Sequence, residues 1–159
     1  MKEHRVFESV PGILRPFKAY IDGLGLGAGD QIVYYGCPGT CTPFIELLAF
    51  ATRACPAEQV FVPLGDEKKA KKLVHAPDIG MQVSGNPARV NPKVVVLMGG
   101  LSMPGTGVTA EEMKAVVSKY RVPVAGVCFM KMFEKTGWTK VFDFSLLIDA
   151  NIAPVDVWQ

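Results

Sequence analysis

A short loop over residues 36–43 brings together residue types that bind anions or act as thiol nucleophiles. It follows an apolar run and precedes a helix that Pro43 is suited to begin. Backbone N–H groups at a helix start attract anions and favour a thiolate, and small residues let a ligand approach the backbone. A tight turn with a buried cysteine and an N-cap threonine explains the same residues equally well. The candidates are Cys37 and Cys41 for catalysis, and Gly36, Gly39, Thr40 and Thr42 for ligand binding.

Several well-known sites need a residue that this loop lacks. A phosphate-binding P-loop requires Lys-Ser or Lys-Thr after its last glycine, and neither pair follows here. A cysteine-based tyrosine phosphatase needs arginine where Pro43 stands. A peroxiredoxin would carry its peroxidatic cysteine where Ile45 stands, and a radical iron–sulfur motif would need a third cysteine close to Phe44. The loop therefore indicates binding or thiol chemistry without indicating a known enzyme class.

A second loop, over residues 99–107, follows the most apolar run of the chain and contains four glycines. Long glycine-containing loops at strand ends often carry function, so we predict a ligand loop that responds strongly to a bound ligand, with Met103 over an apolar part of it. A simple connection to the next helix is the alternative. Cys128 ends a further apolar run, and we favour a structural role for Asp149 at the same edge. The ligand-binding candidates here are Gly99, Gly100, Ser102 and Cys128.

The other cysteine and the histidines are weaker candidates for a functional site. Cys55 precedes Pro56 at a predicted helix end and is expected to be inert, and the histidines are His4 near the start and His75 in the predicted last turn of a helix. Two isolated histidines disfavour a histidine triad or a zinc site. We assign no metal site and leave any cofactor unknown, although ligation by cysteines alone stays open.

The elements that must position these loops alternate along the chain. Apolar and β-branched runs predict strands, and stripes at helical spacing predict helices. The expected strands cover residues 31–35, 59–64, 80–84, 93–98, 123–128 and 142–148; the expected helices follow Gly12, begin at 43, 66 and 109, and cover 130–138. A capping box is expected at Thr109 and Glu112. Residues 151–159 are expected to pack over an edge.

This alternation predicts one α/β domain over residues 1–159, a Rossmann-like three-layer sandwich with a mostly parallel sheet of about five or six strands. Ligands of such sheets bind at the carboxyl ends of the strands, where the strand order reverses. We therefore expect strands 31–35 and 93–98 to be parallel neighbours, with loops 36–42, 99–107 and 128–131 meeting beside them. The glycine-rich run at 23–30 follows a helix and precedes a strand, so it predicts a turn rather than a dinucleotide fingerprint.

Composition limits the partners. The 159 residues carry a net charge of +2, which gives no reason to expect nucleic acid. The charged start lacks a signal peptide, and no apolar run is long enough to span a membrane, so the expected compartment is the cytoplasm. A small molecule is the expected partner, and a homo-oligomer stays open. A lysine-rich stretch predicts a solvated helix face; its residues are Lys68, Lys69, Lys71 and Lys72.

Four stretches together resemble an uncharacterised archaeal family of unknown function, found mainly in methanogens. They are residues 15–18, 36–44, 99–104 and 126–129. The resemblance spans nearly the whole chain and implies an anaerobic archaeal cytoplasm, but it implies no reaction. Three hypotheses follow. The first is a binding protein for a small anionic or nucleotide-like ligand, the second is a thiol-dependent redox or metal-binding protein, and the third is a non-catalytic structural or interaction protein. Whether the chain is an enzyme stays open.

Overall fold

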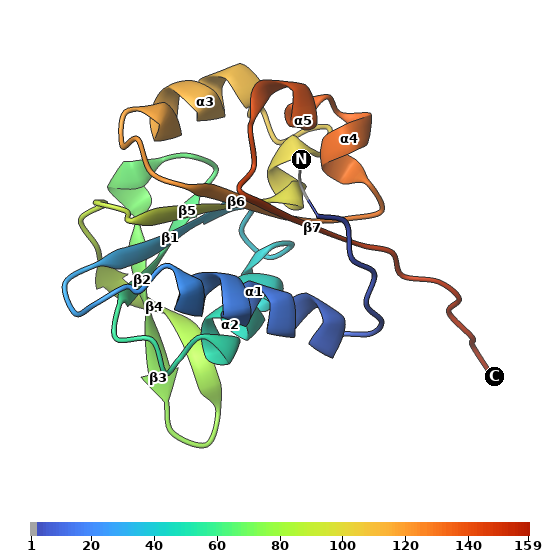
Figure 1. The fold of residues 1–159 in the computed structure, drawn as a ribbon, viewed down its shortest axis with the longest axis horizontal. Helices are drawn as coiled ribbons and strands as arrows, with labels where there is room; N and C mark the ends of the chain where they lie inside the picture. Colours follow the sequence, from blue (N-terminus) through green and yellow to red (C-terminus); the bar gives the residue numbers. More distant parts are fainter. Residues whose placement is uncertain (1–2) are drawn as a thin grey trace.

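The computed structural model describes residues 3–159 and contains one seven-stranded, mostly parallel sheet between two helical layers (Figure 1). The strand order is β4-β3-β2-β1-β5-β6-β7. The α/β fold class is confirmed, with one or two more strands than the sequence predicts. The strands are β1 (Gln31–Gly36), β2 (Glu58–Pro63), β3 (Lys71–Ala76), β4 (Gly80–Pro87), β5 (Val94–Met98), β6 (Val124–Phe129) and β7 (Leu146–Ala150).

The five strands β2, β1, β5, β6 and β7 are parallel, and β1 lies at their switch point. It pairs with β2 on one side and with β5 on the other, with Val33 opposite Val60 and Val95 respectively. All residues of β1 and β5 are buried, because helices cover both faces of the central sheet. The prediction that these two apolar runs are parallel neighbours is therefore confirmed.

The helices cover the sheet from both sides. In Figure 1, α1 (Pro11–Gly23) and α2 (Thr42–Ala51) lie on one face, and α3 (Ala110–Ser118), α4 (Met132–Lys135) and α5 (Trp138–Val141) lie on the other. The neighbouring side chains Tyr34 and Tyr35 point to opposite faces. Tyr34 packs against Phe17 of α1, whereas the Tyr35 hydroxyl donates to Glu67, which also accepts from Tyr120 beyond α3. The predicted capping box at the start of α3 is confirmed.

The helix predicted to begin at residue 66 is wrong. Asp66 caps only one 3₁₀ turn, Glu67–Lys69, by accepting from the Lys68 N–H group at 3.2 Å. The chain then enters β3, which pairs antiparallel with both β2 and β4. The lysines of this stretch and His75 therefore lie on or beside a strand and not on a helix. The predicted strand at 80–84 exists and is longer, forming β4.

The last third of the chain departs from the prediction in two places. The helix expected over 130–138 is two short helices, because Gly137 adopts a left-handed φ of 80° between α4 and α5. Phe142 and Phe144 stack with Phe133 and Trp138 before β7 begins. The expectation that residues 151–159 pack over an edge is wrong: they are exposed and run away from the body of the molecule (Figure 1). No helix within residues 3–159 is long and apolar enough to cross a membrane.

Candidate functional site

A cavity of about 150 Å³ lies at the carboxyl ends of β1, β5 and β6. Loops 36–42 and 99–107 both contribute to its wall, as the sequence predicts, and α4 closes it on one side. Its walls expose almost only apolar atoms. The lining residues are Thr40, Cys41, Phe44, Met98, Gly99, Gly100, Met103, Val127, Phe129 and Met132.

The two glycines after β5 let this loop press against the cysteines. Gly99 and Gly100 begin a 3₁₀ turn, Gly99–Ser102. A Cβ added at Gly100 would lie 2.4 Å from Cys41 Sγ, and a Cβ added at Gly99 would lie 2.5 Å from Cys128 Cβ. Only glycine fits such close contacts, because real Cβ atoms do not approach other heavy atoms to these distances. The start of the loop after β5 therefore packs tightly against the ends of β1 and β6.

Cys37 and Cys41 lie one turn apart, and both sulfurs lie beside Gly100, where an added Cβ would be 3.7 Å from Cys37 Sγ and 2.4 Å from Cys41 Sγ. The Cys41 N–H group donates to the Cys37 carbonyl at 3.0 Å, and Cys37 Sγ donates to the Gly100 carbonyl at 3.1 Å. Burial raises the pKa of Cys37 to about 11, and burial also raises the pKa of Cys41. The expectation that the start of α2 favours a thiolate is therefore wrong, since desolvation outweighs the helix end.

Cys128 lies behind the Gly99 backbone and does not line the cavity. Its Sγ donates to Asp149 Oδ1 at 3.6 Å, and burial raises its pKa to about 12. Asp149 also accepts from the Lys131 N–H group at 2.9 Å, which holds the left-handed residue Lys131 in place and agrees with the expected structural role. Across residues 3–159, no three His, Cys, Asp or Glu side chains form a group that could hold a metal ion. The three thiols therefore lack the arrangement that ligation by cysteines alone requires.

The remaining predicted residues support the loops from outside the cavity. The Gly39 N–H group donates to Thr42 Oγ1 at 3.2 Å, with Gly39 at a left-handed φ of 79°. Thr42 is the first residue of α2, and Cys41 takes the N-cap position expected for Thr42. Ser102 Oγ donates to the Gly99 carbonyl at 2.8 Å. Gly36 packs against Cys41, since a Cβ there would lie 2.8 Å from Cys41 Cβ.

The sequence analysis missed most of the apolar wall. Phe44 appears there only as a core position of a helix, although its ring lies 4.5 Å from that of Phe129 across the cavity wall. The sequence pattern does not distinguish Met98 and Met132 from ordinary core residues. One signal was available: methionines stand directly beside two of the predicted loops, and methionine is common at adaptable binding surfaces.

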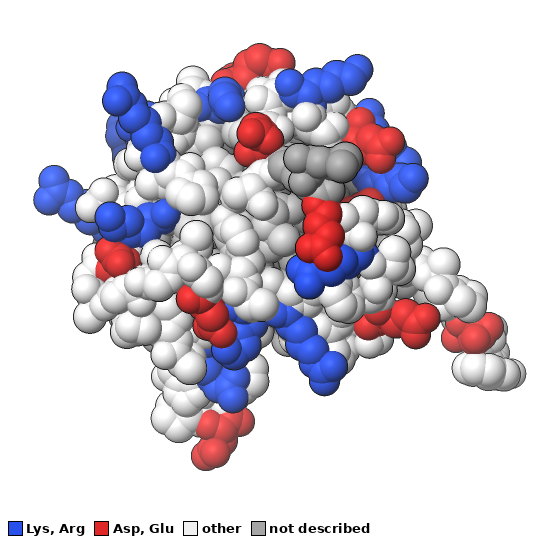
Figure 2. All heavy atoms as spheres, viewed as in Figure 1, with Lys and Arg blue, Asp and Glu red and all other residues white. Residues whose placement is uncertain are grey.

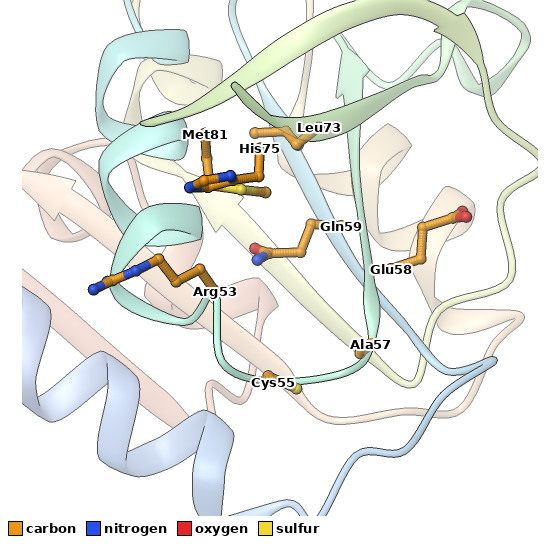
Figure 3. Close-up of a pocket in the computed structure, with 8 residues that line it drawn as sticks. All are labelled: Arg53, Cys55, Ala57, Glu58, Gln59, Leu73, His75 and Met81. Carbon is orange, nitrogen blue, oxygen red and sulfur yellow. The ribbon is translucent and has the colours of Figure 1, made fainter. Parts of the chain in front are cut away.

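A larger cavity of about 410 Å³ lies elsewhere, between the end of α2, the start of β2 and the β3–β4 hairpin (Figure 3). Its two charged side chains, Arg53 and Glu58, already have partners. Arg53 donates to the Phe50 carbonyl and lies 4.0 Å above the Phe50 ring, while Glu58 pairs with Lys72 at 3.1 Å. Arg53 and Glu58 extend away from the centre of this cavity in opposite directions (Figure 3). We assign no ligand to it.

Charge does not mark a site on the face that Figure 2 shows. Basic and acidic side chains are interspersed around its rim, and no patch of a single sign stands out. Such a surface provides no strong field to concentrate a polyanion. This view agrees with the near balance of charges in the sequence.

Known proteins place the chain in a family without assigning it a reaction. It is 38% identical over 141 residues to the uncharacterized protein MJ1183 of Methanocaldococcus jannaschii, covering 88% of this chain and 84% of that protein. It is 38% identical over 126 residues to an uncharacterized protein of Methanothermobacter thermautotrophicus, covering 77% and 80%. A crystal structure of a protein of unknown function from Methanothermobacter thermautotrophicus matches with a TM-score of 0.85 at 31% identity, covering 100% of this chain and 99% of that one. The model of the family described as "Uncharacterized protein conserved in archaea (DUF2124)" matches residues 8–153, so the chain belongs to this uncharacterized archaeal family.

Proposed function

We propose that this protein binds a small molecule whose apolar group enters the cavity at the carboxyl ends of β1, β5 and β6. One observation carries the proposal: the cavity has a volume of about 150 Å³ and apolar walls, and it lies at the switch point of the sheet. Ligand sites in proteins are mostly apolar clefts with few polar groups. A dry apolar cavity of about this volume accommodates benzene, so the buried group is about the size of one aromatic ring.

The walls limit the charge of the buried group. Among the described residues, no lysine, arginine or histidine lines the cavity, and the raised pKa of Cys41 keeps its thiol neutral at physiological pH. An anion has no cationic partner there. The anionic or nucleotide-like ligand favoured by the sequence is therefore proposed in a narrower form, with a neutral apolar group inside and its polar part at the mouth beside Thr40.

Met103 is the proposed adjustable cover. Its side chain is 40% exposed although it lines the cavity, and Gly105 and Gly107 follow it with left-handed φ values. Methionine adapts its shape to different apolar partners. Hydrogen exchange in residues 99–107 is expected to slow more than elsewhere when a ligand binds.

Methyl NMR tests the cavity directly. In protein labelled at the methionine methyl groups, benzene is expected to shift the Met98, Met103 and Met132 resonances and to leave Met81, in the larger cavity, unchanged. Met132→Phe fills the cavity and is expected to weaken benzene binding at least tenfold, whereas Met81→Phe is the matched control. Unshifted Met98 and Met103 resonances at saturating benzene, or equal effects of the two variants, would contradict the proposal. A thermal-shift screen of amphipathic metabolites then identifies the polar part.

A reversible disulfide is the second candidate, because the Cys37 and Cys41 sulfurs lie one turn apart on the same side of Gly100. Forming it oxidises two thiols and releases two protons and two electrons, which an oxidised disulfide such as oxidised glutathione would accept. The raised pKa of both thiols slows this exchange at neutral pH. All four cysteines are free, which suits the reducing cytoplasm that we propose as the compartment. A Cys37–Cys41 link formed rapidly with oxidised glutathione at pH 7, detected by peptide mass spectrometry, would favour this candidate.

A further inference from the structure

The segment after β7, residues 152–158, is an exposed apolar strap. Ile152, Val155, Val157 and Trp158 are 57%, 72%, 78% and 86% exposed. The Ile152 N–H group donates to Met130 Sδ at 3.3 Å, and beyond Ile152 the strap makes no hydrogen bond to any described residue. Single exposed apolar residues are ordinary, but four within seven positions of one exposed segment are a concentration of the kind found at interaction sites.

A second exposed apolar segment lies at the same end of the sheet. Val6, Phe7 and Val10 precede α1 and are each about half exposed or more. In Figure 1 this segment passes beside β7 and reaches α1 on the side from which the strap projects. Within residues 3–159, no strand pairs with the outer edge of β7, which is the last strand of the sheet and pairs with β6 on its inner side. Open strand edges readily accept an extended chain.

We propose that two copies of this chain exchange their straps, each laying residues 152–158 over residues 6–10 of the other copy and along the outer edge of its β7. The strap and the receiving segment lie at the same end of the molecule. A two-fold rotation about that end therefore places each strap on the other copy's receiving segment, and the contact closes without leaving either surface free.

The size of the contact is close to that of a stable interface. The strap, the receiving segment and β7 together supply 17 residues per partner, slightly fewer than the roughly 20–30 of a standard stable interface. Trp158 is the residue type most often dominant in binding energy. Asp156 is the one charged residue of the strap and Glu8 the one charged residue of the receiving segment, so the contact is mainly apolar.

Sedimentation velocity on the full chain tests the exchange. Well above about 1 µM and up to about 1 mM, the wild-type protein is expected to sediment at twice its 17.2 kDa, with a dissociation constant of about 1 µM or below. Val155→Asp and Trp158→Ala are each expected to give a folded monomer, because the strap lies outside the core, and its melting temperature is expected not to rise with protein concentration as that of the wild-type dimer does. The matched control is Ile79→Asp: Ile79 is 71% exposed in the β3–β4 turn, at the opposite end of the sheet, and its change is expected to leave the dimer intact.

Tryptophan fluorescence gives a second measurement. The two tryptophans differ sharply, since Trp138 is 3% exposed and Trp158 is 86% exposed within one chain. The wild-type spectrum minus that of Trp158→Phe is expected to be blue-shifted at high concentration and to shift to the red on dilution. A wild-type protein that stays monomeric across the whole range, a Val155→Asp variant that stays dimeric, or Trp158 emission that is red at every concentration would each overturn the exchange.

Discussion

The close contact between Gly100 and Cys41 makes a testable prediction about packing. A Cβ at residue 100 would lie 2.4 Å from Cys41 Sγ and 3.7 Å from Cys37 Sγ. Cys41 has little room to retreat, because it also packs against Gly36 and is 3% exposed. Adding one carbon to such a site typically costs about 1–3 kcal/mol. We expect Gly100→Ala to lower the free energy of unfolding by about 2 kcal/mol, which lowers the melting temperature by about 4–8 °C in a chain of this length.

A double-mutant cycle isolates the cause. Cys41→Ala alone removes one buried sulfur and is expected to cost about 1 kcal/mol. In the double variant the clash disappears, so its stability is expected to match that of Cys41→Ala, with a coupling of about 2 kcal/mol. Gly85→Ala is the control, because a Cβ at Gly85 would meet no atom within 4 Å.

At Gly99, in contrast to Gly100, shortening the neighbouring cysteine does not remove the clash. A Cβ there would lie 2.5 Å from Cys128 Cβ and 2.9 Å from Cys128 Cα, atoms that Cys128→Ala retains. Adding Cys128→Ala is therefore not expected to restore the stability that Gly99→Ala loses. Guanidinium unfolding under reducing conditions measures all these variants. The packing argument fails if Gly100→Ala is as stable as Gly85→Ala, or if Cys41→Ala does not restore it.

Three further predictions concern single groups. Burial raises the pKa of Cys37 to about 11, so iodoacetamide should alkylate Cys37 at pH 7 about two orders of magnitude more slowly than it alkylates an ordinary cysteine. The alkylation rate should keep rising with pH towards 11, and a plateau near pH 8.5 would contradict this prediction. Gln59→Leu removes the acceptor of the buried Tyr34 hydroxyl, at 2.6 Å, and should cost about 2 kcal/mol in a guanidinium titration, partly recovered by adding Tyr34→Phe. Thr109→Ala breaks the capping box and should cost about 1 kcal/mol, with Thr109→Ser close to wild type.

The sequence predicts the central sheet well, because burial on both faces leaves a continuous apolar run that few other structures explain. Residues 93–98 are the clearest example, and β5 is buried throughout. The same reasoning fails at β3. Ala70, Leu73 and Val74 have helical spacing, and the neighbouring lysines favour helices. Pairing with β2 and β4 overrides this local preference, and a left-handed Asp78 with Gly80 provides the hairpin turn.

The sequence predicts the position of the candidate site better than it predicts the chemistry of the site. Thr40, Cys41, Gly99 and Gly100 do line one cavity, because strand ends and loops follow from the alternation of elements. The character of the cavity could not be predicted, because Met98, Phe129 and Met132 have the same pattern as core residues. The pKa direction of the thiols was wrong for a related reason. Sequence shows that a helix start is near, but the degree of burial that opposes it depends on tertiary packing.

The strand order divides the chain into two consecutive halves, and this affects how the protein folds. Strands β1 to β4 all come from residues 31–87, and β5 to β7 all come from residues 94–150. Each half can therefore pair its own strands while it leaves the ribosome, and β1–β5 is the one strand pairing in residues 3–159 that joins them, across a separation of about sixty residues. The cavity draws Thr40, Cys41 and Phe44 from the first half and its other lining residues from the second. The cavity therefore exists only when both halves are assembled, so a ligand that fills it would hold the two halves together and slow their separation during unfolding.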